Sequence, residues 1–241
     1  MNPLASALYA VAAALAFYGA AAAFVNLPVF PLREVRVVEP TAHVTADEVE
    51  AIVKRELRGN FFTIDLAAAR AAFERLPWVR RVAVRRQWPG RLEVAFEEHV
   101  PLARWGGNAL VNMQGEVFAG TYEGELPSFS GPPGTAKEIA IQYEYFRRAL
   151  SEIGLVPAQV SVSPRRAWQM KLANGLVLEL GREQIEARLA RFVSTYGRTV
   201  AQLGRRVDYV DLRYSNGFAV LVPEFAHERA PAGPKKRRAK A

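Results

Sequence analysis

An uncharged N-terminal segment constrains this chain more than any other feature. No charged side chain precedes Arg33, and residues 4–25 (LASALYAVAAALAFYGAAAAFV) are 22 apolar or small residues in a row. A helix needs about 20 such residues to span a bilayer. A cleaved signal peptide is the alternative, but it has a basic start and a shorter apolar region. The sequence therefore predicts a transmembrane helix over residues 4–25 behind a short cytoplasmic end, residues 1–3.

Charge and composition exclude several kinds of binding site in the rest of the chain. The net charge is +8, and residues 224–241 hold 6 Lys or Arg against 2 Asp or Glu, which is half of that excess. We expect residues 224–241 to be a disordered basic tail and the chain not to bind nucleic acid. Cysteine is absent and the 3 histidines are scattered, so no disulfide and no His-based metal cluster is indicated.

Residues 33–100 show the order β-α-α-β-β. A short strand covers 33–39, and Thr45 with Glu48 three residues later predicts a capping box at the start of a helix that Gly59 stops. Asp65 is expected to cap a second helix. Two alternating strands, 78–88 and 91–99, then meet at the turn Trp88-Pro89-Gly90-Arg91.

Residues 101–223 predict a β-rich domain interrupted by helices. Short strands are expected at 102–105, 109–112, 115–120 and 158–164, and helices at 136–154 and 182–203. Asn174-Gly175 predicts a hairpin with a type I′ turn, and residues 206–222 predict a terminal hairpin around Ser215-Asn216-Gly217. The overall expectation is an α+β chain: a transmembrane helix, a first domain over 33–100 and a β domain over 101–223.

The block RLPWVRRVAVRRQWPGRLEVAFEEHVPLARW, residues 75–105, resembles the bacterial cell-division family FtsQ, called DivIB in some lineages. Its Leu-Pro-Trp-Val, Gln-Trp-Pro and Pro-Leu-Ala-Arg-Trp elements keep the family's order and spacing. The blocks SPRRAWQMKLANGLVLELGREQIEARLARF and VDYVDLRYSNGFAV look like the family's second domain. The resemblance covers residues 27–223, and it implies that residues 33–100 are a POTRA (polypeptide-transport-associated) domain.

The resemblance implies a binding role at the division septum. Family members bind the small division proteins FtsB and FtsL through the β domain. A segment of FtsB adds as a strand beside the last strand of that domain. Other divisome proteins would use the POTRA domain. The resemblance also implies a single-pass inner-membrane protein with its N-terminus cytoplasmic and both domains periplasmic. The charges beside residues 4–25 weakly favour the opposite orientation, because Arg33 and Arg36 follow the helix.

The predicted binding residues lie in two places. Arg165 occupies the basic position that pairs with an acidic partner residue, and the rest belong to the terminal hairpin. These are Arg213, Tyr214, Asn216, Gly217, Phe218, Val220 and Val222. Residues 218–222 are an apolar run without a charge to deter strand pairing. The sequence alone supports two roles for Tyr214 equally: a core side chain and a binding side chain.

Three other functions are weighed against this one. An enzyme is not expected, because no phosphate loop, catalytic triad or zinc spacing is present, and we expect no cofactor and no small-molecule substrate. A periplasmic transport-type POTRA module that handles unfolded outer-membrane proteins is the main alternative, yet residues 101–223 are too few for a membrane barrel. An adaptor acting through the basic tail would need residues 229–241, and we expect their deletion to be tolerated.

Overall fold

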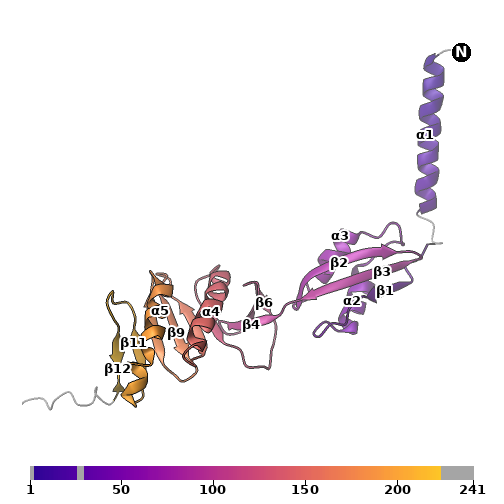
Figure 1. Cartoon of the computed structure of the whole chain (residues 1–241). Helices are drawn as coiled ribbons and strands as arrows, with labels where there is room; N and C mark the ends of the chain where they lie inside the picture. Colours follow the sequence, from indigo (N-terminus) through magenta and orange to yellow (C-terminus); the bar gives the residue numbers. More distant parts are fainter. Residues whose placement is uncertain (1–2, 26–29, 224–241) are drawn as a thin grey trace, which may run out of the picture. The chain divides into compact units, whose positions relative to one another are not determined.

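The computed structural model describes residues 3–25 and 30–223 (Figure 1). The chain divides into two compact units, Met1–His99 and Val100–Ala241, and each is described by itself. The predicted basic tail, residues 224–241, and most of the predicted cytoplasmic end lie outside the described residues.

The N-terminal apolar segment forms helix α1 (Pro3–Val25). Its stretch Ala7–Val25 has a mean hydropathy of 1.9, and none of it is buried against the rest of the protein. Among the described residues, α1 is the one helix that is long and apolar enough to cross a membrane. It is consistent with a single-pass membrane anchor.

A three-stranded sheet with two helices makes up the rest of the first unit. The strands are β1 (Glu34–Val37), β2 (Val79–Gln87) and β3 (Arg91–Glu98), in the order β1-β3-β2. β1 runs parallel to β3, and β2 runs antiparallel to it. Helix α3 (Leu66–Phe73) packs on β2, and helix α2 (Ala46–Glu56) packs on α3. Their apolar faces enclose a core that includes Ile52, Phe73 and Leu92.

Both helices of this unit begin at the predicted caps. The Thr45 hydroxyl accepts from Glu48 N, the Glu48 carboxylate accepts from Thr45 N, and Asp65 accepts from two amides of α3. The prediction that Gly59 ends α2 is wrong. Leu57 already leaves the helix with an extended backbone (φ −82°, ψ 107°), and Gly59 lies further along the loop at φ +110°.

The second unit is built on a nine-stranded sheet. In order across the sheet its strands are β12 (Ala219–Leu221), β11 (Tyr209–Asp211), β10 (Val177–Gly181), β9 (Trp168–Leu172), β8 (Pro157–Val162), β7 (Ser128–Ser130), β4 (Pro101–Trp105), β5 (Ala109–Asn112) and β6 (Val117–Ala119). The pairs β4/β7, β7/β8 and β10/β11 are parallel, and the other pairs are antiparallel. Strand β7 was not predicted.

Two helices cover one face of this sheet and close the core. Helix α4 (Ala136–Ser151) packs on β7 and β8, helix α5 (Ile185–Tyr196) packs on β10, and the two helices touch (Figure 1). Phe129, Phe146 and Phe192 are completely buried between the layers. The helix predicted over 182–203 is two pieces. α5 stops before Gly197, a poor helix former, and a 3₁₀ turn, η1 (Val200–Leu203), follows.

The hairpin between β9 and β10 lies where Asn174-Gly175 predicts it, but its turn is not type I′. Gly175 has φ +92°, whereas Asn174 has no positive φ. The Gly175 amide donates to Leu172 O, and the Asn174 side chain accepts from Leu176 N. This geometry is that of a longer loop in which only the glycine takes the left-handed conformation.

Candidate partner-binding edge

Strand β12 forms one end of the nine-stranded sheet. It pairs with β11 in the register Tyr209↔Leu221, Val210↔Val220 and Asp211↔Ala219. Its other side meets no strand in the described part of the chain. Backbone N–H and C=O groups on such a side are available to a strand from another protein.

Side chains of residues 218–222 alternate between the two faces of the sheet. Phe218 packs edge-on against Phe192 of α5 at a ring distance of 5.8 Å, Val220 packs on the same core, and Val222 is buried. Ala219 and Leu221 are exposed on the other face. Three of the predicted binding residues therefore turn their side chains into the domain, and a partner strand would meet their backbone.

The loop between β11 and β12 presents the predicted contact motif. The Tyr214 side chain is 58 % exposed, so it is not a core residue. Its carbonyl accepts from Nη1 of Arg191 at 2.9 Å, which ties the loop to α5. Asn216 is exposed, and a methyl group at Gly217 would meet no atom within 4 Å. Residues 214–219 line a shallow hollow of about 340 Å³.

Arg213 is held by a carboxylate of its own chain. Its Nε and Nη2 donate to the two oxygens of Asp211 at 2.9 and 2.7 Å. These bonds hold the pKa of the largely buried Asp211 carboxyl below its usual range, and they raise the pKa of Arg213. Arg213 is one of the residues that were predicted to bind the partner. The structure shows that this fork is already engaged.

Arg165 and Arg213 line the same cleft, although 47 positions separate them in the numbering of the chain. The cleft has a volume of about 470 Å³, and its remaining lining residues are Ala167, Gly181, Arg182, Glu183 and Arg188. Four arginines and one glutamate thus line the cleft. Within residues 3–25 and 30–223, neither Arg165 nor Arg182 has an acidic partner. The cleft is suited to an acidic side chain.

Gly181 makes this cleft possible, and sequence reasoning missed it. It ends β10 at φ +78°, a conformation that costs other residues. A β-carbon there would lie 2.6 Å from Nη1 of Arg188 and 3.0 Å from Cγ of Arg213. Both arginine side chains therefore cross directly over the glycine. The sequence signal that could have indicated this cleft was a glycine at the end of a predicted strand, followed directly by Arg182.

Comparisons with known proteins agree with this architecture. The family described as "POTRA domain, FtsQ-type" matches residues 30–99, and "Cell division protein FtsQ/DivIB, C-terminal" matches residues 103–213. Relatives named "Cell division protein FtsQ" come from Nitrosospira multiformis (46% identity, 91% of this chain and 95% of the relative) and Burkholderia pseudomallei (43%, 91% of each). A third, from Coxiella burnetii, is 34% identical over 87% of this chain and 89% of its own length.

An apolar helix, a POTRA domain and a β domain with an open edge define a class of structural cell-division proteins. The chain belongs to the FtsQ/DivIB family.

Proposed function

We propose that this chain recruits FtsB and FtsL by accepting an extended segment of FtsB along β12. The protein then acts by binding and performs no chemistry of its own. We further propose that α1 crosses the inner membrane with its N-terminus in the cytoplasm, and that residues 30–223 lie in the periplasm at the septum. In this way the chain would link early and late division proteins and help to control septal peptidoglycan synthesis.

The open side of β12 is the observation that carries this proposal. Natural edge strands are commonly blunted by lysine, proline or a bulge. Ala219, Val220 and Leu221 include none of these, and the pairing of β12 with β11 is regular. Exposed Tyr214 stands beside the edge, where an aromatic anchor would give a partner strand side-chain contact.

The basic cleft adds specificity to this pairing. An acidic residue of the partner would enter near Arg165 and Arg182, which form no ion pair with a carboxylate of the described residues. Arg213 would contribute its positive charge but no hydrogen bonds to the partner, because its guanidinium group already pairs with Asp211.

The experiment is titration calorimetry of residues 30–223 against a soluble FtsB–FtsL pair. The fragment begins at Phe30 because Leu32 packs on the core of the first unit. Leu221→Lys places a charge on the open edge, and Val117→Lys does the same on β6 at the other end of the sheet. The two positions are matched, with exposures of 50% and 48%. We expect only Leu221→Lys to weaken binding.

Two further variants test the loop and the cleft. Tyr214→Ala should weaken binding by about 2 kcal/mol or more if Tyr214 is an anchor. Arg165→Gln should weaken binding and reduce its salt dependence, whereas Arg166→Gln should not, because Arg166 is paired with Glu138. Equal binding by Leu221→Lys and Val117→Lys would refute pairing at β12.

Membrane orientation has a separate test, since the chain has no cysteine. A cysteine in place of exposed Ala42 should react with a membrane-impermeant maleimide once the outer membrane is opened. Labelling only after the inner membrane is broken would contradict a periplasmic POTRA domain. We also propose that other divisome proteins bind the POTRA domain, and pull-downs with residues 101–223 deleted would test this.

A further inference from the structure

Exposed aromatic side chains gather at one end of the first unit. Outside α1, the described residues with large exposed aromatic rings are Phe62, Trp88 and Tyr214. Tyr214 belongs to the β12 edge. Phe62 (41% exposed) and Trp88 (66% exposed) lie together on loops of the POTRA domain and have no part in strand pairing. Exposed apolar groups of this kind mark a contact with another molecule or with a membrane.

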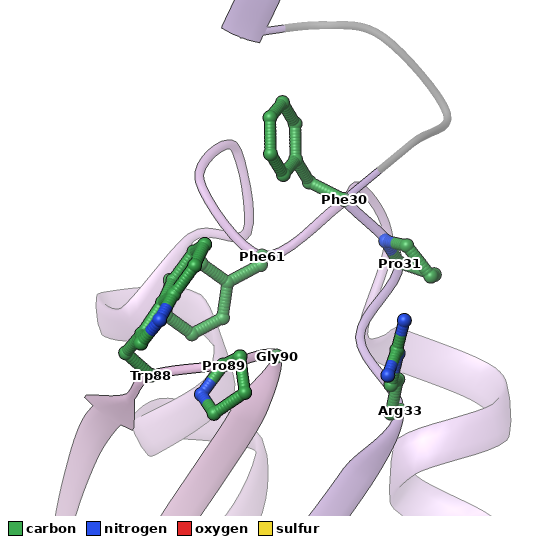
Figure 2. A pocket seen from close by; sticks show the side chains of 7 residues that line it. All are labelled: Phe30, Pro31, Arg33, Phe61, Trp88, Pro89 and Gly90. Carbon is green, nitrogen blue, oxygen red and sulfur yellow. The ribbon is translucent and has the colours of Figure 1, made fainter.

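Four rings form this cluster, which we call the aromatic apex: Phe30, Phe61, Phe62 and Trp88. Ring centroids are 5.0 Å apart for Phe30 and Phe62, 5.1 Å for Phe61 and Phe62, and 5.9 Å for Phe61 and Trp88. Figure 2 shows Phe30, Phe61 and Trp88 around a shallow pocket of about 190 Å³, with Arg33 on the opposite side. Pro31, Pro89 and Gly90 complete its lining.

Hydrogen bonds hold the apex in place while two of its rings stay exposed. Arg86 donates to the carbonyls of Phe61, Phe62 and Ile64 at 2.8, 3.2 and 2.6 Å. The Phe61 amide donates to Phe30 O at 2.9 Å. The loop backbone is thus fixed from β2 and from the segment before β1. Phe62 and Trp88 therefore stay exposed on a backbone that hydrogen bonds hold in place.

The covalent chain places the apex beside the end of α1. Five residue steps join Val25 to Phe30, and five steps extend at most about 18 Å. Phe24 and Phe30 lie 5.5 Å apart between ring centroids, and the Asn60 side-chain amide donates to Val25 O at 2.7 Å. If α1 spans a bilayer, these contacts bring the apex to the bilayer surface.

The charge around the apex suits a phospholipid surface. Arg33 lines the pocket, no acidic residue lines it, and Arg33 has no acidic partner among the described residues. Membrane proteins place aromatic rings, tryptophan above all, at the level of the lipid headgroups. Arginine at the same level lies beside lipid phosphate groups.

We propose that the aromatic apex enters the interfacial layer of the membrane leaflet in which α1 ends, with Arg33 against lipid phosphates. The POTRA domain would then hold a second membrane contact besides its covalent link. The proposal rests on α1 as a membrane anchor. It is independent of strand pairing at β12.

The full chain, reconstituted in nanodiscs, tests this through its own tryptophans. Trp78 and Trp88 flank β2, whose nine residues separate them by about 30 Å. Lipids brominated near the headgroup end of their acyl chains quench only tryptophans close to them. We expect Trp88→Phe to remove most of this quenching and Trp78→Phe to preserve it. The other two tryptophans, Trp105 and Trp168, contribute equally to both variants.

Two more variants test the cause of the quenching. Phe62→Ser keeps the Trp88 reporter but removes a neighbouring ring, so quenching should fall. Arg33→Glu should lower quenching more in anionic than in zwitterionic nanodiscs. Equal quenching in the Trp88→Phe and Trp78→Phe variants would overturn the proposal and leave the apex as a protein contact.

Co-migration of the chain with nanodiscs separates the two possible failures. A chain that co-migrates without Trp88 quenching keeps its anchor and loses only the apex contact. A chain that does not co-migrate refutes the anchor and the apex contact together. Calorimetry on residues 30–223 remains a separate test of partner binding in either case.

Discussion

Replacing Glu98 with glutamine should destabilise the POTRA domain. The Glu98 carboxylate, at the end of β3, accepts from the backbone amides of Ala42, His43 and Val44 at 3.0, 3.0 and 2.9 Å. These amides lie in the segment that leads from β1 to α2. Burial raises the pKa of Glu98, but the three amides and the His43 side chain together outweigh burial, so the pKa lies below its usual range.

The hydrogen bonds set the size of the effect. Hydrogen bonds to a charged group contribute about 1.5–3 kcal/mol, against roughly 0.5–1.5 kcal/mol for neutral ones. Glutamine keeps one acceptor for His43 and Val44, loses the charge, and turns an N–H toward the Ala42 amide. We therefore expect a loss of about 2–3 kcal/mol in the free energy of unfolding, since neutral bonds replace charged ones and one amide is left unpaired.

The loss depends on pH with a definite sign. Because the folded-state pKa of Glu98 is lowered, its stabilisation is fully present above the unfolded pKa of about 4.3. It disappears as the pH falls through the folded-state value. Wild type and Glu98→Gln should differ most near neutral pH and converge in acid.

Urea unfolding of residues 30–223, followed by hydrogen exchange and mass spectrometry, reports the two units separately. Glu50→Gln is the matched control, because Lys54 lowers the pKa of Glu50 as well, yet both side chains of this pair are exposed to solvent. We expect little change from it. A Glu98→Gln protein as stable as Glu50→Gln, or a difference that persists unchanged in acid, would refute the reasoning.

Three further predictions follow from the other sites. Gly181→Ala should cost more stability than Gly175→Ala in thermal unfolding. Both glycines have positive φ, which costs alanine about 1–2 kcal/mol, but only a β-carbon at Gly181 would also clash with neighbouring side chains. Equal losses of stability would refute this clash. Arg213→Ala should destabilise the β11–β12 hairpin in hydrogen exchange above about pH 4, where Asp211 is ionised, and the added change Asp211→Asn should restore part of the loss; a loss that persists in acid would contradict this. Thr45→Ala should cost about 1 kcal/mol by removing the capping box, measured by urea unfolding; an unchanged midpoint would count against it.

Local signals made the helix starts and hairpins predictable from the sequence. Thr45 and Asp65 cap their helices through atoms two or three residues away, and period-two apolar residues marked β2 and β3. The turn at Asn174-Gly175 was located correctly, but its type depended on the backbone of the whole loop.

Features that depend on distant residues were not predictable. Strand β7 has three residues and gains its partners from β4 and β8, so its own sequence is too short for an alternation to predict a strand. The basic cleft joins Arg165 to Arg182 and Arg188 through the pairing of β9 with β10. Asp211 and Arg213 lie only two residues apart in the sequence, yet the sequence alone did not show that their side chains pair.

The parallel pairing of β10 with β11 has a consequence for when this protein can act. Among the described strands β12 pairs only with β11, and β11 joins β10 after the chain has crossed over through α5. Forming this non-local contact requires closure of a long loop, which is slower than forming a hairpin. A chain stalled during synthesis or clipped before residue 209 therefore has no β12 edge to offer. Docking at this edge would report to the division machinery that the domain has finished folding.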